Sequence, residues 1–202
     1  MSSVVNIVSI LKSIIKYAIN NLQYLIFDQN GNIIWPEAAQ NLAQIIEQHE
    51  PQSDEEYQIA IIYAIEPLIA TKSYRDLDEA ILRLPFGLRM LLSTAIGAGK
   101  TFLKANPKYI RELVNEGDEL ILSFFDMPDF SYLKPAIENA PNLRKWILGY
   151  VLQKLNITQA DIEKYAKQKR TRSDRQAAAG EKVQQDTQSQ GLSQQDSGEQ
   201  SS

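Results

Sequence analysis

The first twenty residues carry apolar side chains at the spacing of one face of a helix. Lys12 and Lys16 interrupt the apolar run, and no small-residue cleavage site follows it. The segment is therefore expected to be a core helix rather than a signal peptide. No stretch approaches the roughly 18 consecutive apolar residues of a membrane span, so none is expected. The residues on the apolar face are Val4, Ile7, Ile10, Leu11, Ile14, Ile15, Ala18 and Ile19.

Helix signals dominate the rest of the chain to about residue 170. Ser53 opens Ser-Asp-Glu-Glu, a capping box, and Thr158 opens a similar start at Thr-Gln-Ala-Asp. Asn106 followed by Pro107 predicts the beginning of another helix. Together these signals predict about seven to nine short helices. A further apolar stripe is formed by Leu143, Ile147, Tyr150, Val151 and Leu155.

One segment breaks the helical pattern. Asn30 and Gly31 stand between two short apolar runs, and this pair favours a tight hairpin turn because both residues accept positive φ. We therefore expect a small β-hairpin near residues 24–35, which Pro36 ends before another helix starts. The alternative is that residues 28–32 are only a loop between helices.

The composition changes near residue 173. Residues 173–202 are mostly Gln, Ser, Gly and charged, with only Val183 and Leu192 as large aliphatic side chains. Such a segment buries too little apolar area to offset its ordering entropy. The expected organisation is a helical domain at residues 1–172 and a disordered Gln/Ser-rich tail at residues 173–202. The expected fold class is all-α, a helical bundle with one small hairpin.

The composition offers little for catalysis. The chain has no cysteine, so disulfides and thiolate metal sites are excluded, and its single histidine, His49, is expected to be solvated at a helix end. Nothing sets the mutual distances of the four carboxylates between Asp118 and Asp129, so we predict no catalytic residue, no metal site and no cofactor. Scarce Cys and His beside abundant Ile, Tyr, Lys and Glu are typical of a thermophile. The aromatic residues expected in the core are Phe124, Phe125, Phe130, Tyr132 and Trp146.

Charged residues form blocks along the chain, although the formal net charge is only −4. Residues 1–81 hold 4 basic and 11 acidic side chains, whereas residues 82–111 hold 6 basic and no acidic ones. Residues 112–131 then hold 6 acidic and no basic side chains, and residues 132–175 hold 10 basic and 4 acidic ones. Such blocks predict separate basic and acidic surfaces, suited to polyanion binding or to self-association.

The segment Ser-Thr-Ala-Ile-Gly-Ala-Gly-Lys-Thr-Phe, residues 93–102, ends like a phosphate-binding loop. Thr94 occupies the position of the first glycine of that motif, and the residues before it predict a helix with Phe86 and Met90 among its apolar positions. A nucleotide-binding loop is therefore disfavoured. A helix that ends at Gly97 to Gly99, or a flexible break within a longer helix, is expected instead.

Two basic segments are the candidate nucleic-acid contacts. Residues 83–111 can neutralise phosphates through cations on a stretch without carboxylates, and residues 164–175 can form an arm along a phosphate backbone. The alternative for the first segment is a solvated face paired with the acidic residues 112–129. The candidate residues are Arg83, Arg89, Lys100, Lys104, Lys108, Arg111, Lys164, Lys167, Lys169, Arg170, Arg172 and Arg175.

These patterns lead to three hypotheses about function. The leading one is a non-catalytic accessory protein or subunit of a larger complex that binds DNA or RNA through phosphate contacts. The second is a structural or adaptor protein of a virion or multisubunit assembly, in which charge blocks dock protein partners or further copies. The third and least favoured is a nucleotide hydrolase. A cytoplasmic or virion location is expected.

Overall fold

The computed structural model describes residues 2–166, with side chains from residue 9 onward. The chain divides after Thr158 into two units, and of the second only residues 159–166 are described; they are helical. This helix begins where the Thr158 capping signal predicts it. The expected domain boundary at residue 172 and the expected tail lie outside the described residues.

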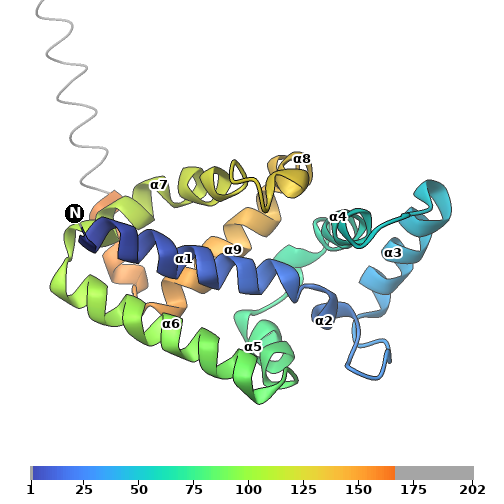
Figure 1. Cartoon of the computed structure of the whole chain (residues 1–202), viewed down its shortest axis with the longest axis horizontal. Helices are drawn as coiled ribbons and strands as arrows, with labels where there is room; N and C mark the ends of the chain where they lie inside the picture. The colour runs from blue at the N-terminus through green and yellow to red at the C-terminus, as the bar shows by residue number, and fades with distance from the viewer. Residues whose placement is uncertain (1, 167–202) are drawn as a thin grey trace, which may run out of the picture. The chain divides into compact units, whose positions relative to one another are not determined.

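The described residues are almost entirely helical, as the apolar periodicity predicts (Figure 1). Together with residues 159–166 they form ten α-helical segments, slightly more than expected because two of them are very short. The α-helices of the first unit are α1 (Ser2–Asn20), α2 (Gln23–Ile26), α3 (Pro36–His49), α4 (Asp54–Ile65), α5 (Tyr74–Leu82), α6 (Phe86–Ala105), α7 (Lys108–Phe124), α8 (Lys134–Glu138) and α9 (Pro141–Lys154). Two 3-10 helices, η1 (Ile69–Thr71) and η2 (Ser131–Leu133), complete it.

The core of the first unit forms where pairs of helices meet. α1 lies along α6, α3 packs against α4, and α7 packs against α9 (Figure 1). The apolar stripe of α1 is buried from Ile10 to Ile19, and the stripe of α9 is buried from Leu143 to Leu155. The aromatic residues expected in the core are buried, except for half-buried Tyr132. Between residues 2 and 166, no helix is both long and apolar enough to cross a bilayer.

Two of the predicted helix starts are confirmed in detail. The hydroxyl of Ser53 accepts a hydrogen bond from the backbone N–H of Glu56, which caps α4. The Glu56 carboxylate accepts from the backbone N–H of Gln52, one residue before the position that a strict capping box uses. Pro36 occupies the first turn of α3, where its missing N–H leaves no hydrogen bond unmade.

The β-hairpin expected near residues 24–35 is not present. Residues 23–26 form the short helix α2 instead of a first strand, and the described residues contain no strand. A single antiparallel bridge between Phe27 and Ile33 is the remnant of the expected pairing. Pro36 starts α3 three residues after this bridge, so little chain is left for a second strand.

The loop between α2 and α3 is closed by one carboxylate. Asp28 accepts hydrogen bonds of 2.8 Å from the backbone N–H groups of Asn30 and Asn32, and one of 2.7 Å from the side-chain amide of Asn32. The bond from the Asn32 side chain is the main reason that the pKa of Asp28 is lowered. Gly31 takes the positive φ of 81° that the Asn-Gly pair predicts. The prediction of positive φ is therefore confirmed for Gly31 but wrong for Asn30, and the predicted flanking strands are wrong.

α6 runs through the glycine-rich segment without a break. The predictions of a helix end, or of a flexible break, at Gly97 to Gly99 are both wrong. A Cβ atom on Gly97 would meet nothing within 4 Å, but one on Gly99 would lie 2.6 Å from Cδ2 of Leu155 and 3.3 Å from Cγ2 of Ile10. Gly99 is therefore the point of close approach at which α6 contacts both α1 and the residue that follows α9.

The two glycines give a matched test of this packing. We expect Gly99→Val to lower the free energy of unfolding by about 1–3 kcal/mol, because the branched side chain has to displace Leu155 or Ile10. Gly97→Val, on the open side of the same helix, is expected to change it by less than about 0.5 kcal/mol. Urea unfolding followed by circular dichroism measures both. Equal effects at the two positions would contradict the assigned role of Gly99.

Candidate nucleic-acid interface

The six cations of residues 83–111 separate into two groups at opposite ends of α6. Arg83 and Arg89 lie at its beginning, whereas Lys100 and Lys104 lie in its last turns. Lys100 is eleven residues beyond Arg89, which places the two positions about 16 Å apart along the helix axis. The basic segment is therefore not one continuous surface.

The two arginines are less exposed than the other four cations and lie apart from them. Both are half-buried. Arg83 ends α5 and is close enough to the Asp28 carboxylate to contribute to the lowering of its pKa. The guanidinium of Arg89 lies 5.9 Å from the ring centroid of Phe86, and its Nε is enclosed by protein atoms.

The other four cations gather where α6 ends and α7 begins, at the left of Figure 1. We call Lys100, Lys104, Lys108 and Arg111 the α6–α7 corner; all four residues are exposed. Lys104 follows Lys100 by one helical turn, and Lys108 and Arg111 open α7. Within residues 2–166, none of the four lies within ion-pair distance of a carboxylate.

An aromatic pair holds the corner together. The rings of Phe102 on α6 and Tyr109 on α7 are half-buried, and their centroids lie 5.2 Å apart. The Lys108 ammonium lies 4.9 Å from the centroid of the Tyr109 ring, a cation–π distance. Tyr109 thus combines a structural contact with partial exposure among cations. Sequence reasoning did not single it out.

The N-terminus of α7 has no side-chain cap. Asn106 was expected to cap it, but its side-chain amide donates a 3.0 Å hydrogen bond to the carbonyl of Phe102 and so closes α6 instead. No acidic residue lies in the first turn of α7. The N–H groups of Tyr109 and Ile110 instead donate to the carbonyls of Asn106 (3.2 Å) and Pro107 (3.1 Å). The positive end of the α7 dipole therefore lies among the corner cations without a carboxylate in its first turn.

Two carboxylates of the acidic residues 112–129 pair with other parts of the structure. Asp118 of α7 accepts a 2.9 Å hydrogen bond from Nε of Arg144 on α9, and Asp126 pairs with Lys134 of α8. Arg144 also donates from Nη1 to the carbonyls of Ile137 (2.7 Å) and Glu138 (2.9 Å). The alternative, in which residues 112–129 neutralise the basic segment 83–111, is not observed in the described residues.

The order of charges along α7 opposes the helix dipole. Cations are favoured at the C-terminus of a helix and carboxylates at the N-terminus, by about 0.3–1 kcal/mol each. α7 instead carries Lys108 and Arg111 at its beginning and only carboxylates, from Glu112 to Glu119, further along. Lys104, at the end of α6, suits its dipole. A charge order that disfavours the helix it occupies is often retained for binding.

The phosphate-loop resemblance has no counterpart in the fold. Lys100 and Thr101 lie inside α6, where the backbone N–H groups are used by the helix and cannot curl around a phosphate. The Thr101 hydroxyl donates a 3.0 Å hydrogen bond to the carbonyl of Gly97, one turn earlier. In residues 2–166, no three His, Asp or Glu side chains are grouped to hold a metal ion. His49 is exposed at the end of α3.

The second predicted segment is largely outside the described residues. Lys164 is exposed on the helix of residues 159–166, and its ammonium lies 5.5 Å from the centroid of the Tyr165 ring. Lys167, Lys169, Arg170, Arg172 and Arg175 lie outside the described residues. The expected basic arm therefore stays a prediction.

One basic cavity was missed from the sequence. A cavity of about 580 Å³ lies between the start of α5 and α9, and Lys72, Arg75 and Lys145 line it beside Trp146. Arg75 is engaged by Glu79 at 3.1 Å, so the cavity has fewer available cations than the corner. Lys145 is more than seventy residues from Lys72, and each lies among residues of mixed charge, so no local pattern links them.

No family model, curated protein or solved structure shows a significant match to the chain. The candidate site therefore rests on its own geometry.

Substitutions at the corner residue Arg111 and at the paired residue Arg144 are expected to change the free energy of unfolding in opposite directions. Arg111→Glu is expected to raise the free energy of unfolding by about 0.3–1 kcal/mol at low ionic strength, because it places a carboxylate in the first turns of α7. Arg144→Ala is expected to lower it by about 2–3 kcal/mol, since Asp118 and two carbonyls lose their donor. Urea unfolding measures both variants. A destabilised Arg111→Glu protein would show that Arg111 has a structural role.

Proposed function

We propose that this protein is a non-catalytic accessory protein that binds nucleic acid through its phosphate backbone, with the α6–α7 corner as the main contact. The observation that carries the proposal is the set of four exposed cations that have no carboxylate within ion-pair distance among the described residues, beside the positive end of the α7 dipole. Phosphate oxygens accept hydrogen bonds from such cations, and their negative charge is favoured at the positive end of a helix dipole.

The chemistry of the corner favours contact with the backbone over base reading. Three of its four cations are lysines, which act as point charges on flexible stems rather than as bidentate readers of base edges. The half-exposed ring of Tyr109 offers one stacking surface for an unpaired base. Binding with strong salt dependence and little sequence preference follows. The predicted arm at residues 164–175 would add phosphate contacts of the same kind.

A second candidate function is that of an adaptor protein. It is supported by large apolar side chains exposed at the beginning of α6, away from the corner cations. Such side chains are typical of a surface that docks another protein. The two functions are compatible, because an accessory subunit has to bind both a nucleic acid and the other proteins of its complex.

Salt-dependent binding provides the test of the first function. We expect full-length protein to bind duplex DNA with a slope of log K against log [salt] of about −3.6 or steeper. This value corresponds to about −0.9 for each of four phosphates contacted. The double variant Lys100→Ala/Lys104→Ala is expected to reduce the magnitude of this slope by about 1.8, since two contacts are lost. Fluorescence anisotropy between about 50 and 200 mM salt measures it, with RNA and single strands titrated alongside.

A matched control is Lys145→Ala, which removes an exposed lysine without an ion-pair partner in the described residues from a different part of the structure. It is expected to leave the slope unchanged. The proposal fails if no DNA or RNA binds at low salt, or if the corner variant keeps the slope of the unmodified protein.

A further inference from the structure

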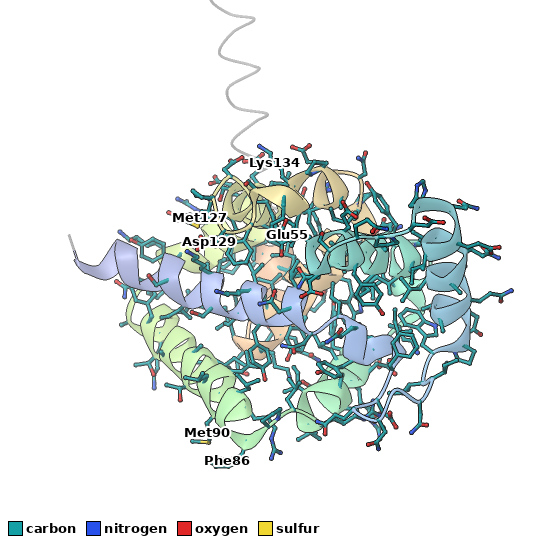
Figure 2. All side chains as sticks on the ribbon, turned by 45° about the vertical axis from the view of Figure 1, so that its right-hand side comes forward. Glu55, Phe86, Met90, Met127, Asp129 and Lys134 are labelled. Atoms are coloured by element: carbon teal, nitrogen blue, oxygen red, sulfur yellow. The ribbon has the colours of Figure 1, made fainter. Side chains whose placement is uncertain are left out.

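The beginning of α6 exposes an unusual concentration of large apolar side chains. We call Leu82, Phe86, Leu88, Met90 and Leu91 the α5–α6 apolar surface; Phe86 and Leu91 are 69% and 67% exposed. Figure 2 shows Phe86 and Met90 pointing away from the neighbouring helices at the beginning of α6. Elsewhere in the described residues, Ile33, Ile34 and Tyr63 are the large apolar residues with comparable exposure.

These residues surround the first two turns of α6 instead of forming one stripe. Phe86 and Met90 are one turn apart on one side, and Leu88 and Leu91 lie on the other. Leu92 faces the core. A helix that is apolar all round is expected to be buried all round. The first turns of α6 therefore have the composition of an interior helix but are covered on one side only.

A hollow flanks α6 on each side of the α5–α6 apolar surface, which stands out between them as a ridge. One, of about 400 Å³, is lined by Leu82, Phe86, Met90 and Arg89. The other, of about 580 Å³, lies between α6 and α1 and is lined by Leu88 and Leu91. A ridge with a groove on either side is the surface that a second helix packs against. A flat lipid surface would leave both grooves unfilled.

Two polar groups beneath this surface lack partners. Nε of Arg89 and the hydroxyl of Tyr17 are enclosed and have no hydrogen-bond partner among the described residues. Burial raises the pKa of the Tyr17 hydroxyl, and the nearby charge of Arg89 opposes this effect. The Arg89 guanidinium lines the first groove but has no carboxylate within ion-pair distance. Its charge is therefore available to a carboxylate brought by a partner.

The nearby carboxylates are already engaged. Asp78 lines the same groove but is held by Lys154 at 2.6 Å, and Glu79 is held by Arg75 at 3.1 Å. Residues 82–111 contain no acidic side chain. A symmetric contact with a second copy would bring each Arg89 towards its counterpart without a neutralising group, so the charges disfavour a homodimer here.

We infer that the α5–α6 apolar surface docks an acidic amphipathic helix of a partner protein. The apolar side chains of that helix fill the two grooves beside Phe86 and Met90, and one of its carboxylates pairs with Arg89. The inference develops the adaptor function and does not depend on nucleic-acid binding. The surface and the α6–α7 corner lie at opposite ends of one helix, so both ligands can be bound at once.

A selection from a defined peptide library tests the inference. The library displays helical peptides on phage, with Leu, Ile or Met at positions i, i+3, i+4 and i+7 and with Asp, Glu, Lys, Arg, Ser or Gln elsewhere. Immobilised full-length protein is the target, and the double variant Phe86→Ser/Met90→Ser is used for counter-selection. We expect enrichment of peptides with a net charge of about −3 or more negative.

Variants then assign the contacts of an enriched peptide by fluorescence anisotropy. Phe86→Ser/Met90→Ser is expected to weaken binding at least about 10-fold, and Arg89→Gln at least about 5-fold, because an apolar anchor and a charge partner are lost. Ile33→Ser, which removes an equally exposed apolar residue elsewhere, and Lys100→Ala/Lys104→Ala are expected to bind like the unmodified protein. Thermal melts check that each variant is folded.

Four outcomes would overturn the inference. Enrichment of no peptide, or of neutral or basic peptides, would exclude an acidic helix as the occupant. A dimer of the unmodified protein that Phe86→Ser/Met90→Ser dissociates in light scattering would assign the surface to a second copy. Binding to phosphatidylglycerol vesicles that the same variant abolishes would assign it to a membrane.

Discussion

Arg144 joins three helices and engages one carboxylate of the acidic block. Its guanidinium joins Asp118 of α7 to the last carbonyls of α8, so one side chain ties α7, α8 and α9 together. The side chain is largely covered, which makes this pair less screened than an ordinary surface ion pair. With Lys134 holding Asp126 in the same region, two carboxylates of the acidic block are directed towards α8 and α9. Among the described residues, the corner cations have no carboxylate within ion-pair distance.

α6 connects the α5–α6 apolar surface with the α6–α7 corner. Its 20 residues span about 30 Å, with the apolar surface at one end and the basic corner at the other. Gly99, one residue before Lys100, lets α1 approach closely, so the helix is anchored next to the basic corner. This arrangement suits a protein that holds a polyanion and a protein partner together, and it requires no catalytic group.

Local sequence patterns predicted the helices well, because the apolar side chains at helical spacing in α1 and α9 are the ones that are buried. These patterns failed at the hairpin for a local reason, and elsewhere because the decisive contact is distant in sequence. The Asn-Gly turn is present, but Asp28 closes it as a loop and leaves no strand to extend. Gly99 suggested a break because glycine weakens an isolated helix; its contact with Leu155, 56 residues later, gives the opposite role. Likewise, charge counts group Arg89 with the corner, whereas its partial burial and its place about 16 Å before Lys100 along α6 separate it.

Protection of specific lysines against chemical labelling tests the central claim most directly. Full-length protein is acetylated at low salt with and without a saturating 20-base-pair duplex, as DNA and as RNA, and each lysine is quantified by mass spectrometry. We expect the duplex to protect Lys100, Lys104 and Lys108 from acetylation. Lys145 and the paired Lys134 are expected to be labelled equally with and without it. Unchanged labelling at the three corner lysines, with the nucleic acid bound, would contradict the central claim.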